Sequence, residues 1–387
     1  MALKKTKKRN ILIITGSRGE YGYIRPIIKL MKQSSIICFQ VLATNMHLLP
    51  EFGNSINEFY NDEITVDHKI YMALSGYTNT TMVKSLGVFM LSVADILSNT
   101  LPDIILLAGD RGEQLVAAIT GAHMNIPVAH IQAGELSGNV DGLTRHAIAR
   151  FAHIHFASNQ DAEQRLINTG EEPFRVFNVG APQLDDFYQN EVAPPNVVAE
   201  YFSIDRDKPL IMVVQHPVTE QSAVSGEQMM ATLQAVLTVG LQSVIIYPNN
   251  DAGSIAIQEC IKQNRGINIR VARNISRYIY GGLMSIASVM IGNSSSGILE
   301  APTFKLPAVN IGRRQHGRYQ GKNVINVEKH DKLAIETAIR KAISTDFRES
   351  IKDIVNPYGD GKASDRILSI LENIPIDEKL IYKRITL

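Results

Sequence analysis

Carboxylates and basic side chains gather directly after two apolar segments, residues 104–108 and 128–131, that are typical of buried strands. They are Asp110 and Arg111 after the first segment, and Glu135, Asp141, Arg145 and His146 after the second. Ligands collect outside the carboxyl ends of the strands of an open parallel sheet, so we expect these side chains to converge on one crevice. Asp110 and Glu135 could form a base and acid pair. The alternatives are a salt bridge from Asp110 to the neighbouring arginine and a helix cap by Asp141.

A serine cluster follows another apolar segment, residues 289–291, in the sequence Gly292-Asn-Ser-Ser-Ser-Gly297. Its hydroxyl and backbone N–H groups could hold a diphosphate at the start of a helix. Glu300, on the helix expected to follow, could accept the two hydroxyls of a ribose. A plain helix N-cap is the alternative interpretation of the serines.

Two further segments stand where strands are expected to end. Glycines in residues 15–22 let the backbone approach a ligand ahead of an expected helix over 24–31, although a simple glycine-rich turn explains the same pattern. The segment has neither the dinucleotide fingerprint nor the ATP-binding loop pattern. His216 follows the apolar segment 210–214 and could be catalytic or structural.

Composition excludes several classes of protein. Lys and Arg total 39 and Asp and Glu total 38, a balance that argues against nucleic-acid binding through bulk charge. No histidine has metal-ligand spacing, so no metal is expected. Cys38 and Cys260 lack a CxxC pattern and are predicted to be buried, reduced thiols of a cytoplasmic protein. The apolar part of the basic N-terminal segment is too short to span a membrane, and no membrane association is expected.

The elements that would position these residues form two similar series of strands and helices. With 387 residues and 45% hydrophobic positions, the chain suits two α/β domains. We expect parallel strands wrapped by helices over two sets of apolar segments: residues 11–14, 38–43, 104–108, 128–131 and 155–157, then 210–214, 243–247, 267–271, 289–291 and 308–311. The proline pair at Pro194 predicts the boundary. The predicted domains are residues 1–194 and 195–361, and a helix in 362–387 packs back on the first.

Taken together and in order, these segments resemble one family. The segments are Gly16-Ser-Arg-Gly-Glu-Tyr21, Gly109-Asp-Arg111, His130-Ile-Gln-Ala-Gly-Glu135, Arg145-His146, Gln215-His-Pro217, Pro248-Asn-Asn-Asp-Ala-Gly253 and Gly292-Asn-Ser-Ser-Ser-Gly297. The set is similar to the hydrolysing UDP-N-acetylglucosamine 2-epimerases of sialic-acid biosynthesis, from about residue 10 to beyond Arg318. The resemblance implies the stand-alone bacterial type, a GT-B-like fold with two Rossmann-like domains facing a central cleft, and a homodimer or homotetramer.

The resemblance also implies an activity and roles for residues. The expected reaction converts UDP-N-acetylglucosamine into UDP and N-acetylmannosamine by anti elimination of UDP and addition of water, without any cofactor. The expected acid/base groups are Asp110, Glu135, Asp141 and His216. The expected substrate contacts are Arg18, Ser294 and Ser295 on the β-phosphate, Glu300 on the ribose, Asn274 and Ile275 around the uracil, and Arg111, Arg145, His146, Asn249 and Arg314 elsewhere in the site.

Several alternatives stay open. Gln132 and Ala133 depart from the family pattern in a loop close to the sugar, so the resemblance leaves the sugar open. A nucleotide-linked 2,4-diacetamido-2,4,6-trideoxyglucose, the substrate of the legionaminic-acid route, is the first alternative. A non-hydrolysing 2-epimerase and a GT-B glycosyltransferase are alternative activities, and a UDP-sugar sensor is the alternative outside enzymology.

Overall fold

The computed structural model describes residues 8–76, 78–264 and 266–386, and its strands form two parallel sheets. The first sheet has the order β3-β2-β1-β4-β5-β6-β7 and the second the order β10-β9-β8-β11-β12-β13. The strands are β1 (Arg9–Thr15), β2 (Ile37–Thr44), β3 (His68–Ile70), β4 (Ile104–Ala108), β5 (Val128–Ala133), β6 (Ile154–Ala157), β7 (Val176–Asn178), β8 (Leu210–Val214), β9 (Gln242–Ile246), β10 (Ile269–Ala272), β11 (Val289–Gly292), β12 (Ala308–Ile311) and β13 (Val324–Val327). The predicted α/β class with two Rossmann-like halves is confirmed.

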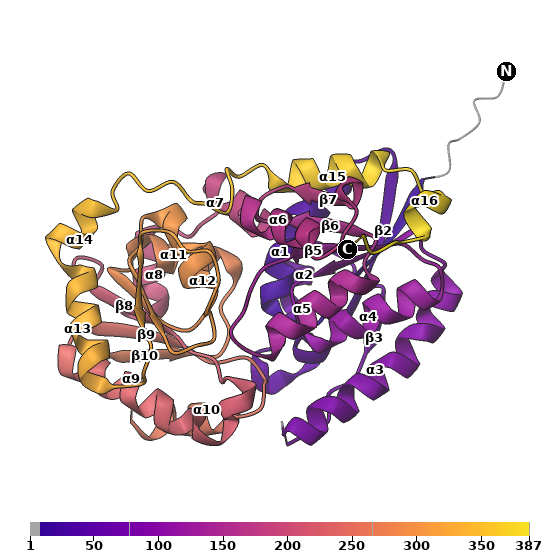
Figure 1. Cartoon of the computed structure of the whole chain (residues 1–387). Helices are drawn as coiled ribbons and strands as arrows, with labels where there is room; N and C mark the ends of the chain where they lie inside the picture. Colours follow the sequence, from indigo (N-terminus) through magenta and orange to yellow (C-terminus); the bar gives the residue numbers. More distant parts are fainter. Residues whose placement is uncertain (1–7, 77, 265, 387) are drawn as a thin grey trace.

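Helices connect the strands and cover both faces of each sheet (Figure 1). They are α1 (Arg18–Met31), α2 (Ile56–Asn61), α3 (Asn79–Thr100), α4 (Gly112–His123), α5 (Val140–Phe151), α6 (Gln160–Asn168), α7 (Asp185–Tyr188), α8 (Pro195–Phe202), α9 (Ser225–Val239), α10 (Ser254–Gln263), α11 (Arg277–Ile286), α12 (Ser296–Leu299), α13 (Lys332–Ile343), α14 (Thr345–Ser350), α15 (Ala363–Asn373) and α16 (Glu378–Ile381).

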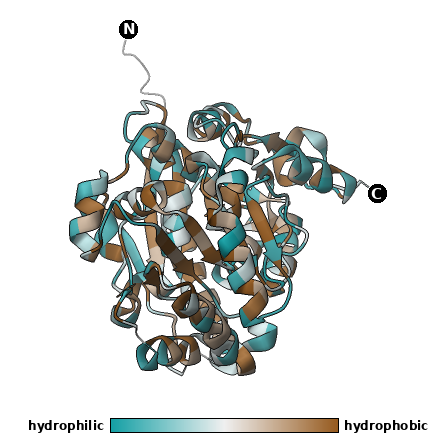
Figure 2. Cartoon of the chain, turned by 90° about the vertical axis from the view of Figure 1, so that its left-hand side faces the viewer, coloured by the Kyte–Doolittle hydropathy of each residue, from teal (hydrophilic) through white to brown (hydrophobic). Residues whose placement is uncertain are grey.

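Each sheet is covered on both faces, and its central strands are buried and mostly apolar. In the first unit, α1 and α15 pack on one face and α3 and α4 on the other. In the second unit, α9, α10 and α13 cover one face and α8 and α11 cover the other. Figure 2 shows the hydrophobic strands of the molecule enclosed by helices whose outer sides are largely hydrophilic.

The C-terminal segment crosses from the second unit to the first (Figure 1). After α14 the chain runs over the top of the molecule, and α15 packs against α1. Ile367 and Leu371 of α15 are fully buried in the core of the first sheet. The Arg9 side chain donates to the carbonyl oxygen of Ile374 at 2.9 Å, which fixes the end of this helix. The crossing lies beside the linker between the two units, where the N–H of Ala181 donates to the carbonyl oxygen of Tyr358 at 2.7 Å.

Three strands lie outside the apolar segments that predicted the others. β3, β7 and β13 are edge strands with the sequences HKI, VFN and VINV. An edge strand is covered on fewer sides, so its sequence carries a weaker apolar signal. The prediction that both cysteines are buried is wrong for Cys38, which is exposed near the start of β2, whereas Cys260 is buried.

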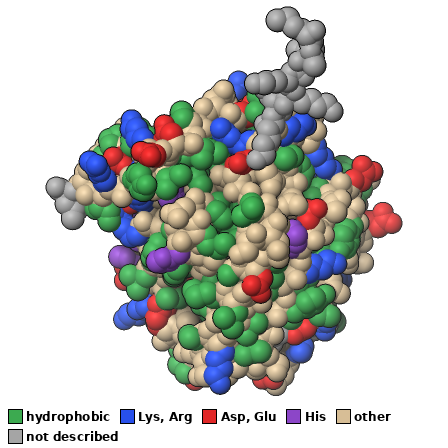
Figure 3. Space-filling model, turned by 90° about the vertical axis from the view of Figure 1, so that its right-hand side faces the viewer, with side chains coloured by type: hydrophobic (Ala, Val, Ile, Leu, Met, Phe, Trp, Pro, Cys, Tyr) green, Lys and Arg blue, Asp and Glu red, His purple; other side chains and the backbone are tan. Residues whose placement is uncertain are grey.

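Helix α3 differs from the other helices in its composition. By length and mean hydropathy, 1.5, it is the one described helix that could cross a membrane, yet only 22% of that apolar window is buried inside the protein. Core helices of soluble proteins pass the same test when they are mostly buried. Much of the apolar surface of α3 is therefore exposed on this chain, on the side of the molecule shown in Figure 3.

Candidate active site between the two sheets

The candidate site lies where the order of strands reverses in each sheet. In the first sheet this point is between β1 and β4, and in the second it is between β8 and β11. The loops after these four strands carry the glycine-rich segment, Asp110, His216 and the serine cluster. Connections leave in opposite directions at such a point, so a crevice opens outside the strand ends. The two crevices face each other across one cavity.

Both units contribute side chains to this cavity. Its polar and charged lining comprises Ser17, Arg18, Glu20, Tyr23, Glu58, Asp110, Arg111, Ser137, Asn139, Asp141 and Arg145 from the first unit, and His216, Asn249, Arg277, Tyr280, Ser294, Ser295, Ser296, Glu300, Arg314, Gln315 and Arg318 from the second. Thus most of the residues that the sequence predicts for the site meet here. Gly138 permits the close approach of the two units, because a Cβ there would overlap the carbonyl oxygen of Arg313. Gly292 permits close packing within the second unit, where a Cβ would overlap the carbonyl oxygen of Val214.

The cavity favours an anionic ligand. Six arginines line it against five carboxyl groups. Three of those carboxyls are shifted toward the neutral form: burial and the neighbouring Glu113 raise the pKa of Glu20, burial raises the pKa of Glu58 to about 7, and burial raises the pKa of Asp141 to about 6. Positive charge therefore exceeds negative charge at neutral pH, which suits a diphosphate. Among the described residues no cluster of His, Cys, Asp and Glu has the arrangement of a metal site.

Asp110 is held as an anion by Arg145. Burial alone would raise the pKa of Asp110, but Arg145, Arg318 and other arginines outweigh it and hold that pKa below its usual value. Arg145, whose side chain is 1% exposed, forms an ion pair with Asp110 and donates to the backbone oxygen of Glu135 at 3.1 Å. Asp110 therefore pairs with Arg145 on α5 and not with Arg111, its neighbour in the sequence.

The pKa of Asp141 is shifted in the opposite direction from that of Asp110. It accepts from Asn139 Nδ2 at 2.8 Å and pairs with Arg314 Nη2 at 3.2 Å. Burial and the nearby charge of Asp110 nevertheless raise its pKa to about 6. Two carboxyls in one site with pKa values pushed apart are typical of a proton-transfer centre, because one stays ionised while the other exchanges a proton near neutral pH.

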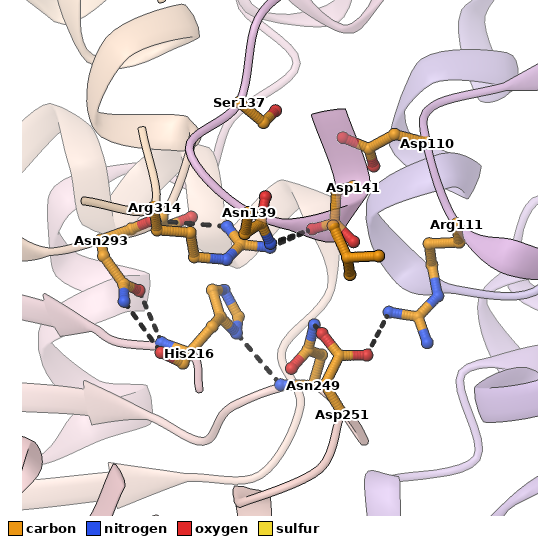
Figure 4. A network of polar contacts seen from close by, with 12 residues as sticks. Asp110, Arg111, Ser137, Asn139, Asp141, His216, Asn249, Asp251, Asn293 and Arg314 are labelled. Carbon is orange, nitrogen blue, oxygen red and sulfur yellow. Dashed lines mark hydrogen bonds and ion pairs between the residues drawn. The ribbon is translucent and has the colours of Figure 1, made fainter. Parts of the chain in front are cut away.

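His216 is fixed by backbone contacts at the end of β8 (Figure 4). Its N–H donates to Asn293 Oδ1 at 2.7 Å, and Asn293 Nδ2 donates to its carbonyl oxygen at 2.8 Å. The N–H of Asn249 donates to its ring Nδ1 at 3.1 Å. Burial, with Arg314 and Arg18 nearby, lowers the pKa of His216 far below its usual value. The ring is therefore neutral, and with Nδ1 accepting a hydrogen bond, its proton belongs on Nε2.

The serine cluster is more compact than its sequence suggests. Helix α12 has only four residues, and Glu300 lies at its C-terminal end instead of within a longer helix. Ser294 and Ser295 line the cavity, while Ser296 donates to Glu300. Arg277 Nη1 pairs with the same carboxylate at 2.7 Å. Ser294 Oγ accepts from the N–H of Ser296 at 3.4 Å, and its hydroxyl, like that of Ser295, can still donate to a ligand. Glu300 is held in a fixed position by Ser296 and Arg277.

Arg18 and Arg111 reach across the cavity to the opposite unit. Arg18 donates to the carbonyl oxygens of Tyr247 at 2.8 Å and Arg273 at 2.9 Å. Arg111 donates to Asp251 Oδ1 at 3.0 Å and Asn250 Oδ1 at 2.9 Å, and Figure 4 shows its contact with Asp251. These contacts connect the two units in this conformation, so both arginines serve the interface as well as lining the cavity.

Three predicted site residues do not line the cavity. The Glu135 carboxylate lies outside the cavity and accepts hydrogen bonds from Ser158 at 2.6 Å and Asn159 at 2.7 Å. Its predicted pairing with Asp110 is not observed. His146 lies on α5 one residue beyond Arg145 and is not among the lining residues. Asn274 Oδ1 accepts a hydrogen bond from Arg18 Nη1 at 3.3 Å, whereas its neighbour Ile275 does line the cavity.

Other lining residues lie outside the predicted set. Glu20 lies in the glycine-rich segment, and Arg277 lies two residues after Ile275, so both are close in sequence to residues that were predicted for the site. Tyr280, Tyr23 and Glu58 come from helices, where the sequence does not show which side faces a ligand. Several buried polar atoms of the lining have no protein partner: Glu20 Oε1, Asn139 Oδ1, Asn249 Oδ1, Arg277 Nε, Arg314 Nε and Gln315 Oε1. Such atoms are places where a polar ligand can bind.

Glu58 gives the fold a pH dependence that can be measured. Its pKa is raised by burial to about 7 from an ordinary 4.5, so its contribution to stability is lost as the pH rises through this window. At about 1.4 kcal/mol per pKa unit, we expect Glu58→Gln to be more stable than the wild type at pH 8, by at most on the order of 3 kcal/mol. Urea unfolding at pH 5 and pH 8 measures this. The exposed Glu63→Gln is the control, and an equal gain in both variants would contradict the assignment.

Comparison with known sequences agrees with this geometry. A sequence model described as UDP-N-acetylglucosamine 2-epimerase matches residues 29–372. The chain is 37% identical over 377 residues to a Legionella pneumophila protein named UDP-N,N'-diacetylbacillosamine 2-epimerase (hydrolyzing), covering 97% of this chain and 98% of that protein. It is 28% identical over 365 residues to a Neisseria meningitidis protein named UDP-N-acetylglucosamine 2-epimerase, covering 94% and 95%.

A solved structure has the same fold. The crystal structure of a UDP-N-acetylglucosamine 2-epimerase from Neisseria meningitidis bound to UDP-N-acetylglucosamine superimposes with a TM-score of 0.79. The superposition covers 94% of this chain and 99% of that one at 19% sequence identity. At this identity the likeness concerns the fold, with two parallel sheets on either side of a cavity.

Proposed function

Because the chain belongs to the UDP-N-acetylglucosamine 2-epimerase family, we propose that this nucleotide-sugar 2-epimerase is of the hydrolysing type and acts on UDP-N,N'-diacetylbacillosamine. This sugar is 2,4-diacetamido-2,4,6-trideoxyglucose. The products are UDP and the corresponding 2-epimer, a 2,4-diacetamido-2,4,6-trideoxymannose. The observation that carries the choice of sugar is the 37% identity over nearly the whole chain to a relative named for that substrate.

One feature of the cavity supports a deoxy sugar. Met46 is the one aliphatic side chain that the first unit contributes to the lining described above, and it is 2% exposed. A thioether packs well against a methyl group at C6 but offers little to the hydroxyl that UDP-N-acetylglucosamine carries there. Met46 lies in the unit that also supplies Asp110 and Asp141, on the proposed sugar side of the cavity.

The first chemical step is the elimination of UDP. A carboxylate takes the proton from C2, the electrons of that C–H bond form the C1–C2 double bond, and the C1–O bond breaks with its electron pair leaving on the β-phosphate. We assign proton transfer to Asp141, because a pKa of about 6 suits a group that exchanges a proton near neutral pH. Asp110 stays ionised beside Arg145 and orients the reacting sugar.

Departure of UDP places negative charge on the β-phosphate, and the second unit supplies donors for it. Ser294, Ser295 and Arg314 line the cavity on this side. His216 presents its protonated Nε2, since Nδ1 accepts from the backbone. Donors held in place before the charge develops stabilise the transition state more than the ground state. Water then adds to C1 of the glycal, and a proton adds to C2 from the opposite face, which inverts that centre.

UDP-N-acetylglucosamine is the second candidate substrate, favoured by the 28% identical relative that bears its name. The two are separated by measuring kcat/KM for each sugar nucleotide with the same enzyme. Since a site shaped for an apolar group discriminates against an added hydroxyl by about 10- to 100-fold, we expect a preference of that size for the diacetamido sugar. Met46→Gln should reduce the ratio. A preference for UDP-N-acetylglucosamine would instead establish the second candidate.

A further inference from the structure

Tyr23 of α1 brings a free hydroxyl group to the cavity. Its ring lies beside the backbone of β4, where a Cβ at Gly109 would be 3.5 Å from Tyr23 Cε2. Four charged groups lie close enough to act electrostatically on the hydroxyl: Asp110, Arg145, Glu300 and Arg318. All four line the cavity, so the hydroxyl end of the ring faces it. Among the described residues none forms a hydrogen bond with this hydroxyl, which leaves it available to a ligand.

Tyr23 lies between the two parts of the cavity. Asp110 acts on Asp141, on the side proposed for the reacting sugar. Glu300 lies beside the serine cluster on the opposite side, because Ser296 donates to it. The diphosphate of a nucleotide sugar joins the nucleoside to C1 of the sugar, so it passes from one side to the other. A phenol that is close to both Asp110 and Glu300 therefore lies alongside the diphosphate.

The basic side chains of the first unit leave this position open. Three arginines of that unit line the cavity, and protein acceptors engage all of them. Arg18 donates to two backbone oxygens of the second unit, and Arg111 donates to two side chains of the same unit. Arg145 pairs with Asp110. The Tyr23 hydroxyl is a donor of the first unit that none of these contacts occupies.

The hydroxyl of Tyr23 keeps its hydrogen. Burial and the nearby carboxylates of Asp110 and Glu300 raise the pKa of Tyr23 to about 12. The phenol is therefore a neutral donor at any pH at which the protein would work. A terminal phosphate is a far weaker base, since the second pKa of a phosphate monoester is about 6. Tyr23 can thus hold a phosphate oxygen by a hydrogen bond without transferring its proton.

We propose that the Tyr23 hydroxyl donates a hydrogen bond to the oxygen that joins C1 to the β-phosphate and holds this oxygen as it leaves with the C1–O electron pair. The assignment rests on the proposed elimination and adds a donor opposite the serines of the second unit. A bridging ester oxygen is a weak acceptor, whereas in UDP the same oxygen shares the charge of the terminal phosphate. The hydrogen bond strengthens as the C1–O bond breaks, so it lowers the barrier.

Apolar packing is the simpler role for this side chain, because the ring also packs against the core of the first sheet. Tyr23→Phe separates the two roles, since phenylalanine keeps the ring and removes only the oxygen. With UDP-N,N'-diacetylbacillosamine we expect the variant to release UDP about 10- to 100-fold more slowly in a single turnover, the range for a hydrogen bond to a charged group. Tyr201→Phe, at a tyrosine 54% exposed on α8, is the matched control with the wild-type rate.

Binding without turnover locates the contact. UDP carries the β-phosphate and UMP does not, so calorimetric titration with both compounds isolates that group. We expect Tyr23→Phe to bind UDP about tenfold more weakly than the wild type does, because a hydrogen bond to a charged oxygen is lost. UMP should bind the variant and the wild type equally. A role in packing alone would leave both affinities unchanged.

The remaining outcomes separate this assignment from the proposed reaction. A wild-type rate of UDP release in Tyr23→Phe overturns the assignment while the reaction stands. An equal loss of affinity for UDP and UMP also overturns it, because the hydroxyl would then contact the ribose or the α-phosphate. A wild-type protein that releases no UDP from either candidate sugar nucleotide overturns the reaction and the catalytic role, and a loss of affinity confined to UDP would still support the β-phosphate contact. Circular dichroism melting shows that each variant is folded.

Discussion

Asp141→Asn is expected to lower kcat by about 10²- to 10⁴-fold, the usual loss when a general acid or base is removed. The asparagine keeps the size of the side chain and its contact with Asn139, so the cavity should retain its shape. The affinity for UDP should stay within a few fold, because Ser294 and Ser295 do not contact Asp141 and the amide oxygen of the variant can still accept from Arg314. Steady-state kinetics and calorimetric titration with UDP measure the two quantities.

The pH dependence distinguishes proton transfer from a structural effect. Since burial and Asp110 raise the pKa of Asp141 to about 6, kcat/KM of the wild type should fall as the pH drops through about 6 and the carboxylate takes up a proton. Asp141→Asn should lack this acid limb. Asp353→Asn, at an exposed position far along the chain, is the control with an unchanged profile. A variant that keeps a tenth or more of kcat, or the same acid limb, would rule out Asp141 as the proton-transfer group.

Arg145→Met is expected to destabilise the protein by about 3–5 kcal/mol, the cost of leaving one partner of a buried ion pair without the other. The Arg145 side chain is 1% exposed and pairs with Asp110 while donating to the Glu135 carbonyl and Ser137 Oγ. Methionine fills most of the volume but supplies neither charge nor donors. Urea unfolding measures the change, with Arg340→Met, in an exposed pair on α13, as a control expected to cost about 0–1 kcal/mol.

A second substitution separates the charge from the packing. In Arg145→Met/Asp110→Asn the unpaired carboxylate is also removed, so the double variant should be more stable than Arg145→Met alone. If the double variant loses the sum of both single effects, the two residues do not interact in the way the structure shows. Neither protein should turn over substrate at the wild-type rate, because Asp110 lines the cavity.

The apolar pattern predicts the strands that are buried on both faces, and those strands position most of the site. Strands β1, β4, β8 and β11 each contain an unbroken run of buried apolar residues, and the residues that follow them, including Asp110 and His216, meet at the cavity. Edge strands such as β3 escape the pattern because only part of their surface is covered. Local hydrophobicity therefore locates the sheet centre, where this fold binds ligands.

The sequence does not predict the role of a residue when that role depends on the direction in which its side chain points. At the end of β5 the register shifts and Gln132 adopts a φ of 61°, and beyond this irregularity Glu135 contacts Ser158 and Asn159 away from the cavity. Spacing along the chain cannot show that turn. Glu58 reaches the cavity from α2, which is distant in the sequence from the segments predicted to form the site.

The same limit applies to the apolar residues of α3. Hydrophobic side chains at helical spacing usually predict a core helix, and only the fold shows that Val83 and Leu91 face outward. Whether an apolar side of a helix is buried within its own chain is decided by tertiary structure, which helical spacing alone does not show.

The most direct measurement is a reaction of the purified protein with UDP-N,N'-diacetylbacillosamine in D₂O, followed by proton NMR. Removal of the C2 proton and its replacement from solvent requires deuterium at C2 of the product. We expect free UDP together with a 2,4-diacetamido-2,4,6-trideoxymannose that carries deuterium at C2. A nucleotide-linked 2-epimer without release of UDP, or release of UDP with hydrogen retained at C2, would contradict hydrolytic epimerisation by elimination.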